Sequence, residues 1–102
     1  MTKKYDKLVR DKIPEIVKAR GENIQIHIAN EAEYWQKLKE KLQEEVSEFL
    51  VDESIAEMAD VLEVIDALCE IKGFAREDVL RVQKQKADER GGFRKRIILE
   101  ES

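Results

Sequence analysis

The chain has few of the residues that break helices or cross-link a fold. It contains one proline, Pro14, one cysteine, Cys69, and four glycines. So few helix breakers favour a helix-rich structure. A single cysteine excludes an internal disulfide and fits a reducing compartment, so we expect a cytoplasmic protein.

Long apolar segments are also missing. The N-terminal segment has no apolar signal core, and no uncharged apolar run approaches the length of a membrane-spanning helix. Charged residues are plentiful instead, and 23 acidic against 19 basic side chains give a net charge of -4. This balance disfavours nucleic-acid binding, which relies on a basic surface. We therefore expect neither a membrane nor a nucleic acid as partner.

The apolar pattern predicts a mainly α fold, an antiparallel helical bundle of about four helices. The expected helices lie in residues 10–21, 30–51, 54–73 and 76–92. Alternating isoleucines in residues 23–29 and an apolar run in residues 93–99 leave open a small two-stranded β pair. The whole chain, residues 1–102, fits one domain with a thin core, which a second copy would enlarge.

Capping signals set the expected starts of the helices. Asp11, Asn30 and Ser54 are residues of the type that caps a helix N-terminus, whereas Ala75 gives the last helix a weak start. The helix in residues 54–73 is apolar around most of its circumference. Such a helix belongs in the middle of a bundle or at a contact between subunits.

Acidic side chains are concentrated in residues 43–62. They are Glu44, Glu45, Glu48, Asp52, Glu53, Glu57 and Asp60. The ordinary interpretation is a solvated helix face. Glu57 also has a role that needs no metal, because Ser54 and Glu57 form an S-x-x-E capping box.

The spacing of these acids supports a second interpretation. In one unbroken helix, at about 100° per residue, Glu48 and Glu57 would lie on opposite sides. The capping signal at Ser54 instead predicts a break, after which the chain folds back antiparallel. Each helix then presents an i, i+3 pair on one face, Glu45 with Glu48 and Glu57 with Asp60.

Four converging carboxylates need a counter-charge. They repel one another, and acids drawn toward a core are costly unless something neutralises them. Oxygen ligands suit Mg²⁺, or Mn²⁺ as the alternative, rather than zinc. No E-x-x-H pair is present, which disfavours a di-iron bundle. Mg²⁺ with few protein ligands keeps positions for water and phosphate oxygens, so phosphate-ester or anhydride chemistry is the leading inference.

Two acidic motifs carry a resemblance to a known family. "EEVSE", residues 44–48, followed by "EMAD", residues 57–60, resembles the E-E-x-x-E … E-x-x-D signature of MazG-like all-α nucleoside triphosphate pyrophosphohydrolases. "YDKLVRDKIPEIV" near the start and "KADERGGF" near the end are similar to a small house-cleaning group of that superfamily. The spacer, residues 49–56, is shorter than is usual in the family and allows only a tight turn.

The resemblance implies roles for the acids. Glu45, Glu48, Glu57 and Asp60 would bind Mg²⁺, and Glu44 would be a supporting carboxylate, so Glu44 and Glu45 are the expected catalytic residues. The implied reaction hydrolyses a nucleoside triphosphate between its α and β phosphates, giving the monophosphate and pyrophosphate. The family also implies a homodimer or homotetramer with sites near subunit contacts.

Basic and aromatic residues supply candidate substrate contacts. Lys86 and Arg90 form a K-x-x-x-R pair on one helix face, which resembles a phosphate-binding element of the family; the alternative is a solvated helix end. Arg10 is a further phosphate candidate, or a structural partner of Asp11. Phe93 follows two glycines and is the candidate for stacking on a base.

Two other functions stay open. The chain could be a non-catalytic helical dimerisation or regulatory module, because of the wide apolar surface of the helix in residues 54–73. It could also hydrolyse a phosphoribosyl-nucleotide or a nucleotide-sugar anhydride with the same metal ions. The sequence does not separate these substrates.

Overall fold

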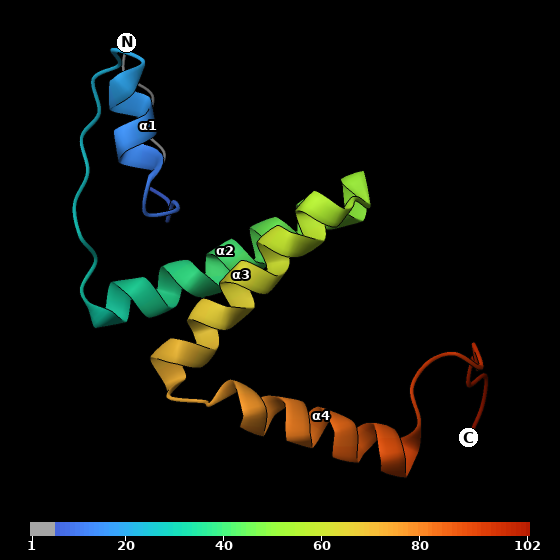
Figure 1. Cartoon of the computed structure of the whole chain (residues 1–102). Helices are drawn as coiled ribbons and strands as arrows, with labels where there is room; N and C mark the ends of the chain where they lie inside the picture. The colour runs from blue at the N-terminus through green and yellow to red at the C-terminus, as the bar shows by residue number, and fades with distance from the viewer. Residues whose placement is uncertain (1–5) are drawn as a thin grey trace.

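A computed structural model describes residues 6–102, which contain four helices. They are α1 (Ile13–Ala19), α2 (Glu31–Asp52), α3 (Ile55–Lys72) and α4 (Arg76–Arg90). The mainly α fold is therefore confirmed (Figure 1). None of the helices in this part of the chain is long and apolar enough to cross a membrane. Residues 1–5, including Tyr5 at the start of the front motif, lie outside the described residues.

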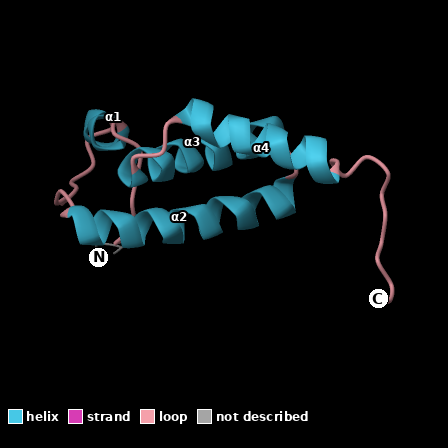
Figure 2. Cartoon of the chain, turned by 90° about the horizontal axis from the view of Figure 1, so that it is seen from below, coloured by secondary structure: helices cyan, strands magenta, loops and turns pink. Residues whose placement is uncertain are grey.

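The helices α2 and α3 form an antiparallel hairpin at the centre of the molecule. α2 ends at Asp52 and α3 begins at Ile55, so Glu53 and Ser54 alone make the reversal. The Ser54 hydroxyl accepts a hydrogen bond from the backbone N–H of Glu57 at 3.2 Å. The two helices lie side by side in both views (Figures 1 and 2). The predicted break and hairpin are confirmed.

The core of the hairpin is narrow. Among the described residues, the buried apolar side chains are Leu38 on α2 and Val64 on α3, with 1% and 7% of their surface exposed. Each such side chain contributes about 1.5–3 kcal/mol when it leaves water. Glu45 is also buried, with 7% of its surface exposed. A carboxylate thus occupies one of the few interior positions of the fold.

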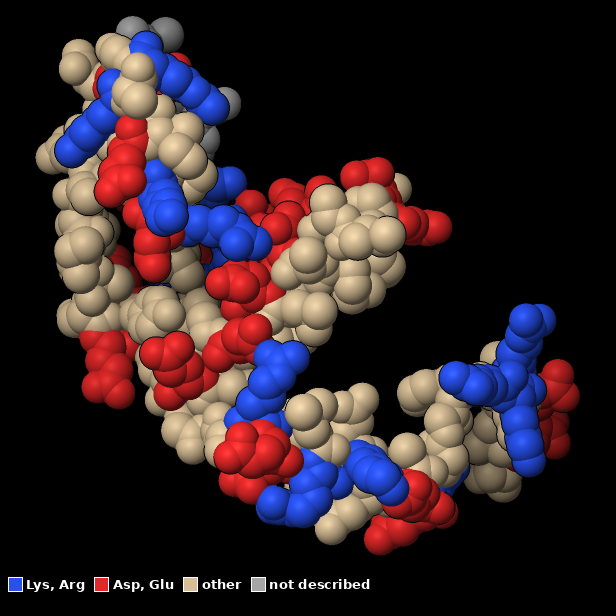
Figure 3. Space-filling view, in the orientation of Figure 1, with Lys and Arg blue, Asp and Glu red and all other residues tan. Residues whose placement is uncertain are grey.

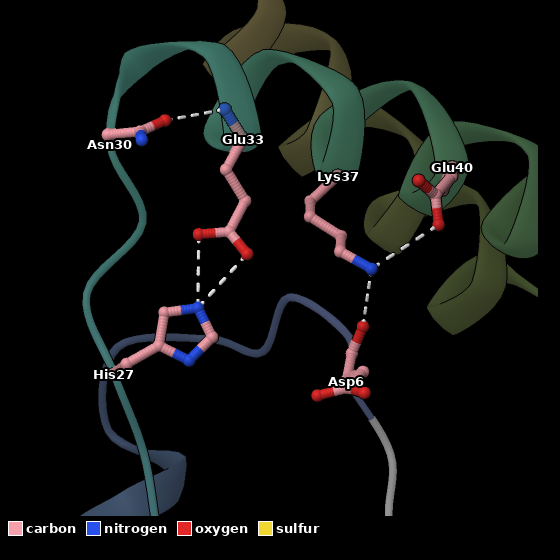
Figure 4. Close-up of polar contacts among 6 residues, drawn as sticks. All are labelled: Asp6, His27, Asn30, Glu33, Lys37 and Glu40. Atoms are coloured by element: carbon pink, nitrogen blue, oxygen red, sulfur yellow. Dashed lines mark hydrogen bonds and ion pairs between the residues drawn. The ribbon is translucent and has the colours of Figure 1, made fainter.

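The start of α2 is held by local polar contacts (Figure 4). The Asn30 side chain accepts a hydrogen bond from the backbone N–H of Glu33 at 2.9 Å, as the capping signal predicts. The Glu33 carboxylate lies 3.0 Å from Nε2 of His27. Lys37 donates to the backbone oxygen of Asp6 at 2.6 Å. These contacts fasten the loop before α2, and the segment before α1, to the first turns of α2.

The predicted cap of α1 is wrong. The N-cap is Lys12 instead of Asp11, and no side chain caps this helix. A cap at Asp11 would bond the N–H of Ile13 or Pro14, two or three positions on. Pro14 has no N–H, and the N–H of Ile13 already donates to the backbone oxygen of Arg10 at 3.0 Å. Asp11 therefore has no donor left to cap.

The β pair does not form. Residues 23–29 and 93–99 are both loops, and they lie on opposite sides of the chain (Figure 1). Strand pairing between them would have to close most of the chain into one loop, and α4 leads the second segment away from the first (Figure 1). Their apolar side chains are largely exposed instead; these are Ile26, Ile28, Ile97, Ile98 and Leu99.

The last helix, α4, leaves the hairpin. Gly73 ends α3 in the left-handed conformation, with φ 72°, and Ala75 starts α4 without a side-chain cap, as expected. An ion pair between Arg76 and Asp66 joins the start of α4 to α3. Beyond this corner α4 projects away from α2 and α3 (Figure 1).

Candidate metal centre

Three carboxylates converge across the hairpin. Glu45 comes from α2, and Glu57 and Asp60 come from α3. One oxygen from each lies within 4.8 Å of the other two. The tight turn at residues 53–54 produces this arrangement, because it sets the last turns of α2 against the first turns of α3. Three of the four predicted metal ligands are thereby brought together.

Two oxygens in this cluster are buried without a partner. Oε2 of Glu45 and Oε2 of Glu57 have almost no exposed surface and no hydrogen-bond donor. The other oxygen of Glu45 lies 3.3 Å from Nζ of Lys41. A buried carboxylate oxygen without a donor costs free energy, because it has lost water and gained nothing in return. A divalent cation is a group that would satisfy both oxygens at once.

Glu48, the fourth predicted ligand, lies at the edge of the cluster. Its side chain is exposed, and it is not one of the three that share the 4.8 Å cluster. It still faces the same region, because it lines a surface depression together with Glu57 and Ser47. Burial raises the pKa of Glu45, and hydrogen bonding and charge from Glu48 raise it further, against the opposing effect of Lys41.

Glu44, the predicted supporting carboxylate, is not one of the three clustered carboxylates, and it contacts two lysines. Its Oε1 lies 3.1 Å from Nζ of Lys7 and 3.5 Å from Nζ of Lys41. Partial burial acts to raise the pKa of Glu44, but hydrogen bonds and positive charge from the two lysines outweigh it and lower the pKa. As the pH falls, Glu45 therefore takes up its proton at a higher pH than Glu44 does, and Glu44 remains ionised.

Arg10 reaches the cluster from the N-terminal side. Its Nη2 donates to Oδ1 of Asp60 at 2.8 Å. Both side chains are partly exposed, at 56% and 37% of their surface. The expected pairing of Arg10 with the adjacent Asp11 is thus not the contact that forms. The Arg10 guanidinium therefore lies beside the carboxylates, where it could also bind an anionic ligand.

The other predicted substrate residues lie apart from the acids. Lys86 and Arg90 are exposed on α4, which packs on neither α2 nor α3 along its length. Phe93 follows α4 and is 97% exposed. Within one chain the structure does not bring these three residues to the carboxylates.

Sequence reasoning allowed that basic residues could neutralise the acids, but it did not identify which lysines pair with them. Lys41 contacts both Glu44 and Glu45, at i, i+3 and i, i+4 spacing. The pattern K-x-x-E-E on one helix was a usable signal for these pairs. Lys7 approaches from a segment far away in sequence, so no local pattern could have found it.

Comparison with known proteins gives a partial match to one uncharacterized protein. No protein-family model matches the chain, and no solved structure matches it. A stretch of 41 residues is 49% identical to an uncharacterized protein of Mycolicibacterium smegmatis (strain ATCC 700084 / mc(2)155). The match covers 40% of this chain and 42% of that protein. The match therefore spans less than half of either chain, and it does not indicate an activity.

Proposed function

We propose that this chain is a Mg²⁺-dependent nucleotide pyrophosphohydrolase. The substrate class is a nucleoside triphosphate, canonical or modified, and the products are the monophosphate and pyrophosphate. A single cysteine fits a reducing compartment such as the cytoplasm, and we place hydrolysis of free nucleotides there. The observation that supports the proposal most is the convergence of Glu45, Glu57 and Asp60 across the hairpin.

The donor set fits the proposed ion. All three converging groups are carboxylates, and hard oxygen ligands are those that Mg²⁺ and Mn²⁺ prefer. Glu45 and Glu57 each have a buried oxygen without a partner, which an ion would satisfy. Glu48 stands at the exposed rim, where it completes the signature that resembles the MazG-like enzymes. When bound, Mg²⁺ would neutralise phosphate charge at the point where the anhydride breaks.

The neighbouring side chains have separate tasks in this proposal. Glu44 keeps a lowered pKa and so remains an acceptor. An ionised acceptor orients a water molecule for attack on the α phosphorus, because it accepts one of the hydrogen bonds that the water donates. Arg10 lies beside Asp60 and would turn to a phosphate oxygen, since guanidinium groups bind phosphates strongly. Lys86, Arg90 and Phe93 would reach this site only from another chain or after a movement of α4.

The test is a substrate panel. Purified protein with Mg²⁺ is mixed with standard and modified nucleoside triphosphates, and with a phosphoribosyl-nucleotide and a nucleotide-sugar, and pyrophosphate or monophosphate release is measured. We expect release with at least one triphosphate, and loss of release in Glu57→Gln. The matched control is Glu40→Gln, which removes the same charge from an exposed position of α2. No release from any compound would count against the proposal.

A non-catalytic helical module is the second candidate function. Its support is the apolar surface that α3 leaves exposed, with Ile55 at 91% and Leu62 at 47%. A module of this kind needs no metal. Its chain would show no Mg²⁺-dependent rise in melting temperature, and neutralising Glu45 would leave the response to Mg²⁺ unchanged.

A further inference from the structure

Residues 6–12, which precede α1, reach the acidic side chains of the hairpin; we call this segment the N-terminal strap. Nζ of Lys7 lies 3.1 Å from Oε1 of Glu44, and Nη2 of Arg10 donates to Oδ1 of Asp60 at 2.8 Å. In a space-filling view, basic surface of the N-terminal part meets acidic surface of the hairpin (Figure 3). Opposite charges therefore attach the strap to the hairpin, and one attachment point is a carboxylate of the candidate metal centre.

This attachment is weak enough to be reversible. No side chain of residues 6–12 is buried, and α1, which follows the strap, has no buried residue either. The contact of Lys37 with the backbone oxygen of Asp6 is a further polar one (Figure 4). Exposed ion pairs contribute little to stability, because water and salt compete with them. A change of charge on the hairpin is thus sufficient to shift the strap.

Asp60 has two competing uses. It bonds Arg10, and it is also one of three carboxylates that each place an oxygen within 4.8 Å of the others. Three ionised carboxylates attract the guanidinium with three negative charges, and a bound Mg²⁺ cancels two of them. Oε2 of Glu45 and Oε2 of Glu57 have no donor while the strap is in place. Arg10 therefore neutralises one side of the cluster and leaves the buried side to an ion.

We propose that the N-terminal strap is a latch that a divalent cation releases. In the metal-free chain Arg10 holds Asp60 and the strap is closed. When an ion binds the three carboxylates, the attraction on Arg10 falls and the strap leaves the hairpin together with Lys7. By thermodynamic linkage, the closed strap weakens cation binding by the same factor by which the cation weakens the strap.

The latch sets an order of binding. It rests on the proposed function, because it requires the same ion at the same carboxylates, but it requires no hydrolysis. Arg10 is engaged with Asp60 until the ion arrives, so its guanidinium is available to a phosphate group only afterwards. An anionic substrate is then captured by a chain that already holds its metal.

Chemical labelling of arginine measures the state of the strap. Phenylglyoxal modifies guanidinium groups, it reacts more slowly with one that a carboxylate holds, and mass spectrometry reads each arginine of the full chain separately. We expect labelling of Arg10 to rise about two- to fivefold when Mn²⁺ replaces EDTA, which is the range that an exposed ion pair accounts for. Arg81, which pairs with Asp78 on α4, is the internal reference and should not change.

Acetylation of lysines tests whether the strap moves as a unit. Labelling of Lys7 should rise together with that of Arg10, whereas Lys84, which pairs with Asp88 on α4, should stay constant. A rise at Arg10 alone would mean that one side chain turns while the strap stays closed, and it would overturn the latch.

Two variants test the attachment without any metal. In EDTA, Asp60→Asn removes the partner of Arg10, so its Arg10 labelling should equal that of the wild type in Mn²⁺. Glu63→Gln removes the same charge from an exposed position of the same helix and should label as the wild type does in EDTA. Equal labelling of Asp60→Asn and the wild type in EDTA would also overturn the latch.

These outcomes separate the latch from the proposed function. Saturable Mn²⁺ binding with unchanged labelling of Arg10 overturns the latch and leaves the metal centre and the hydrolase standing. Raised labelling without pyrophosphate release from any triphosphate supports the latch and counts against the hydrolase. Absence of Mn²⁺ binding overturns both.

Discussion

Replacing Glu45 by glutamine should stabilise the metal-free chain. Glu45 is 7% exposed, and one of its oxygens has no hydrogen-bond donor. An unsatisfied buried group costs about 1–3 kcal/mol, while the i, i+4 pair with Lys41 returns only about 0.3–0.5 kcal/mol. We therefore expect the free energy of unfolding to rise by about 1 kcal/mol at pH 7 in EDTA. For a chain of this length, that raises the melting temperature by about 4–8 °C.

The sign of this effect follows from the raised pKa of Glu45. Burial and Glu48 make the folded chain keep the Glu45 proton to a higher pH than the unfolded chain does. The penalty is then full above the raised pKa and disappears as the pH falls to the ordinary glutamate range. The gain from Glu45→Gln should accordingly be present at pH 7 and fade in acid.

In Mg²⁺, the wild type should become more stable than Glu45→Gln, which reverses the order expected in EDTA. At a hundredfold excess over its dissociation constant, a bound ion stabilises the wild type by about 2.7 kcal/mol. Glu45→Gln should gain little from Mg²⁺, because the variant has lost a charged ligand. Differential scanning calorimetry at one protein concentration, with EDTA and then Mg²⁺, measures both effects. A less stable variant in EDTA that responds to Mg²⁺ as the wild type does would refute the reasoning.

Three further predictions concern the surroundings of the cluster. Ser54→Ala removes the cap of α3, so the free energy of unfolding in a urea titration should fall by about 0.5–2 kcal/mol; no change would mean that the cap does not hold the hairpin. Arg10→Gln breaks an exposed ion pair with Asp60 and should alter stability by less than about 1 kcal/mol, while calorimetric titration shows tighter Mg²⁺ binding because a competing cation is gone; weaker binding would contradict this. Burial and then the charges of Glu70 and Asp11 raise the pKa of Tyr34, so Glu70→Gln should lower that pKa in an ultraviolet titration, and an unchanged pKa would separate the two residues.

Local sequence signals predicted the helices well because their causes are local. Ser54 lies at the start of an apolar-rich helix, and its hydroxyl accepts a hydrogen bond from the backbone N–H of Glu57. This contact joins residues three positions apart, so it does not depend on the rest of the fold. Gly73 ends the same helix because it alone adopts a left-handed conformation at little cost. The hairpin, and with it the meeting of Glu45 with Glu57, followed from these signals.

Long-range features escaped the sequence. One local feature was also missed: Asp11 is of a capping type, but the N–H of Ile13 already donates to the backbone oxygen of Arg10. The contacts of Lys7 with Glu44 and of Arg10 with Asp60 join residues far apart in the chain. The sequence predicted a helix in residues 76–92, but no local signal indicated that α4 would project away from α2 and α3.

The central claim is that Glu45, Glu57 and Asp60 hold a divalent cation together. Titration of Mn²⁺ into the metal-free chain, followed by the loss of the free-ion electron paramagnetic resonance signal, tests it most directly, because Mn²⁺ takes the same oxygen ligands as Mg²⁺. We predict saturable binding by the wild type and by Glu40→Gln, competition by Mg²⁺, and loss of binding in Glu57→Gln. No binding, or equal binding by the wild type and Glu57→Gln, would contradict the account.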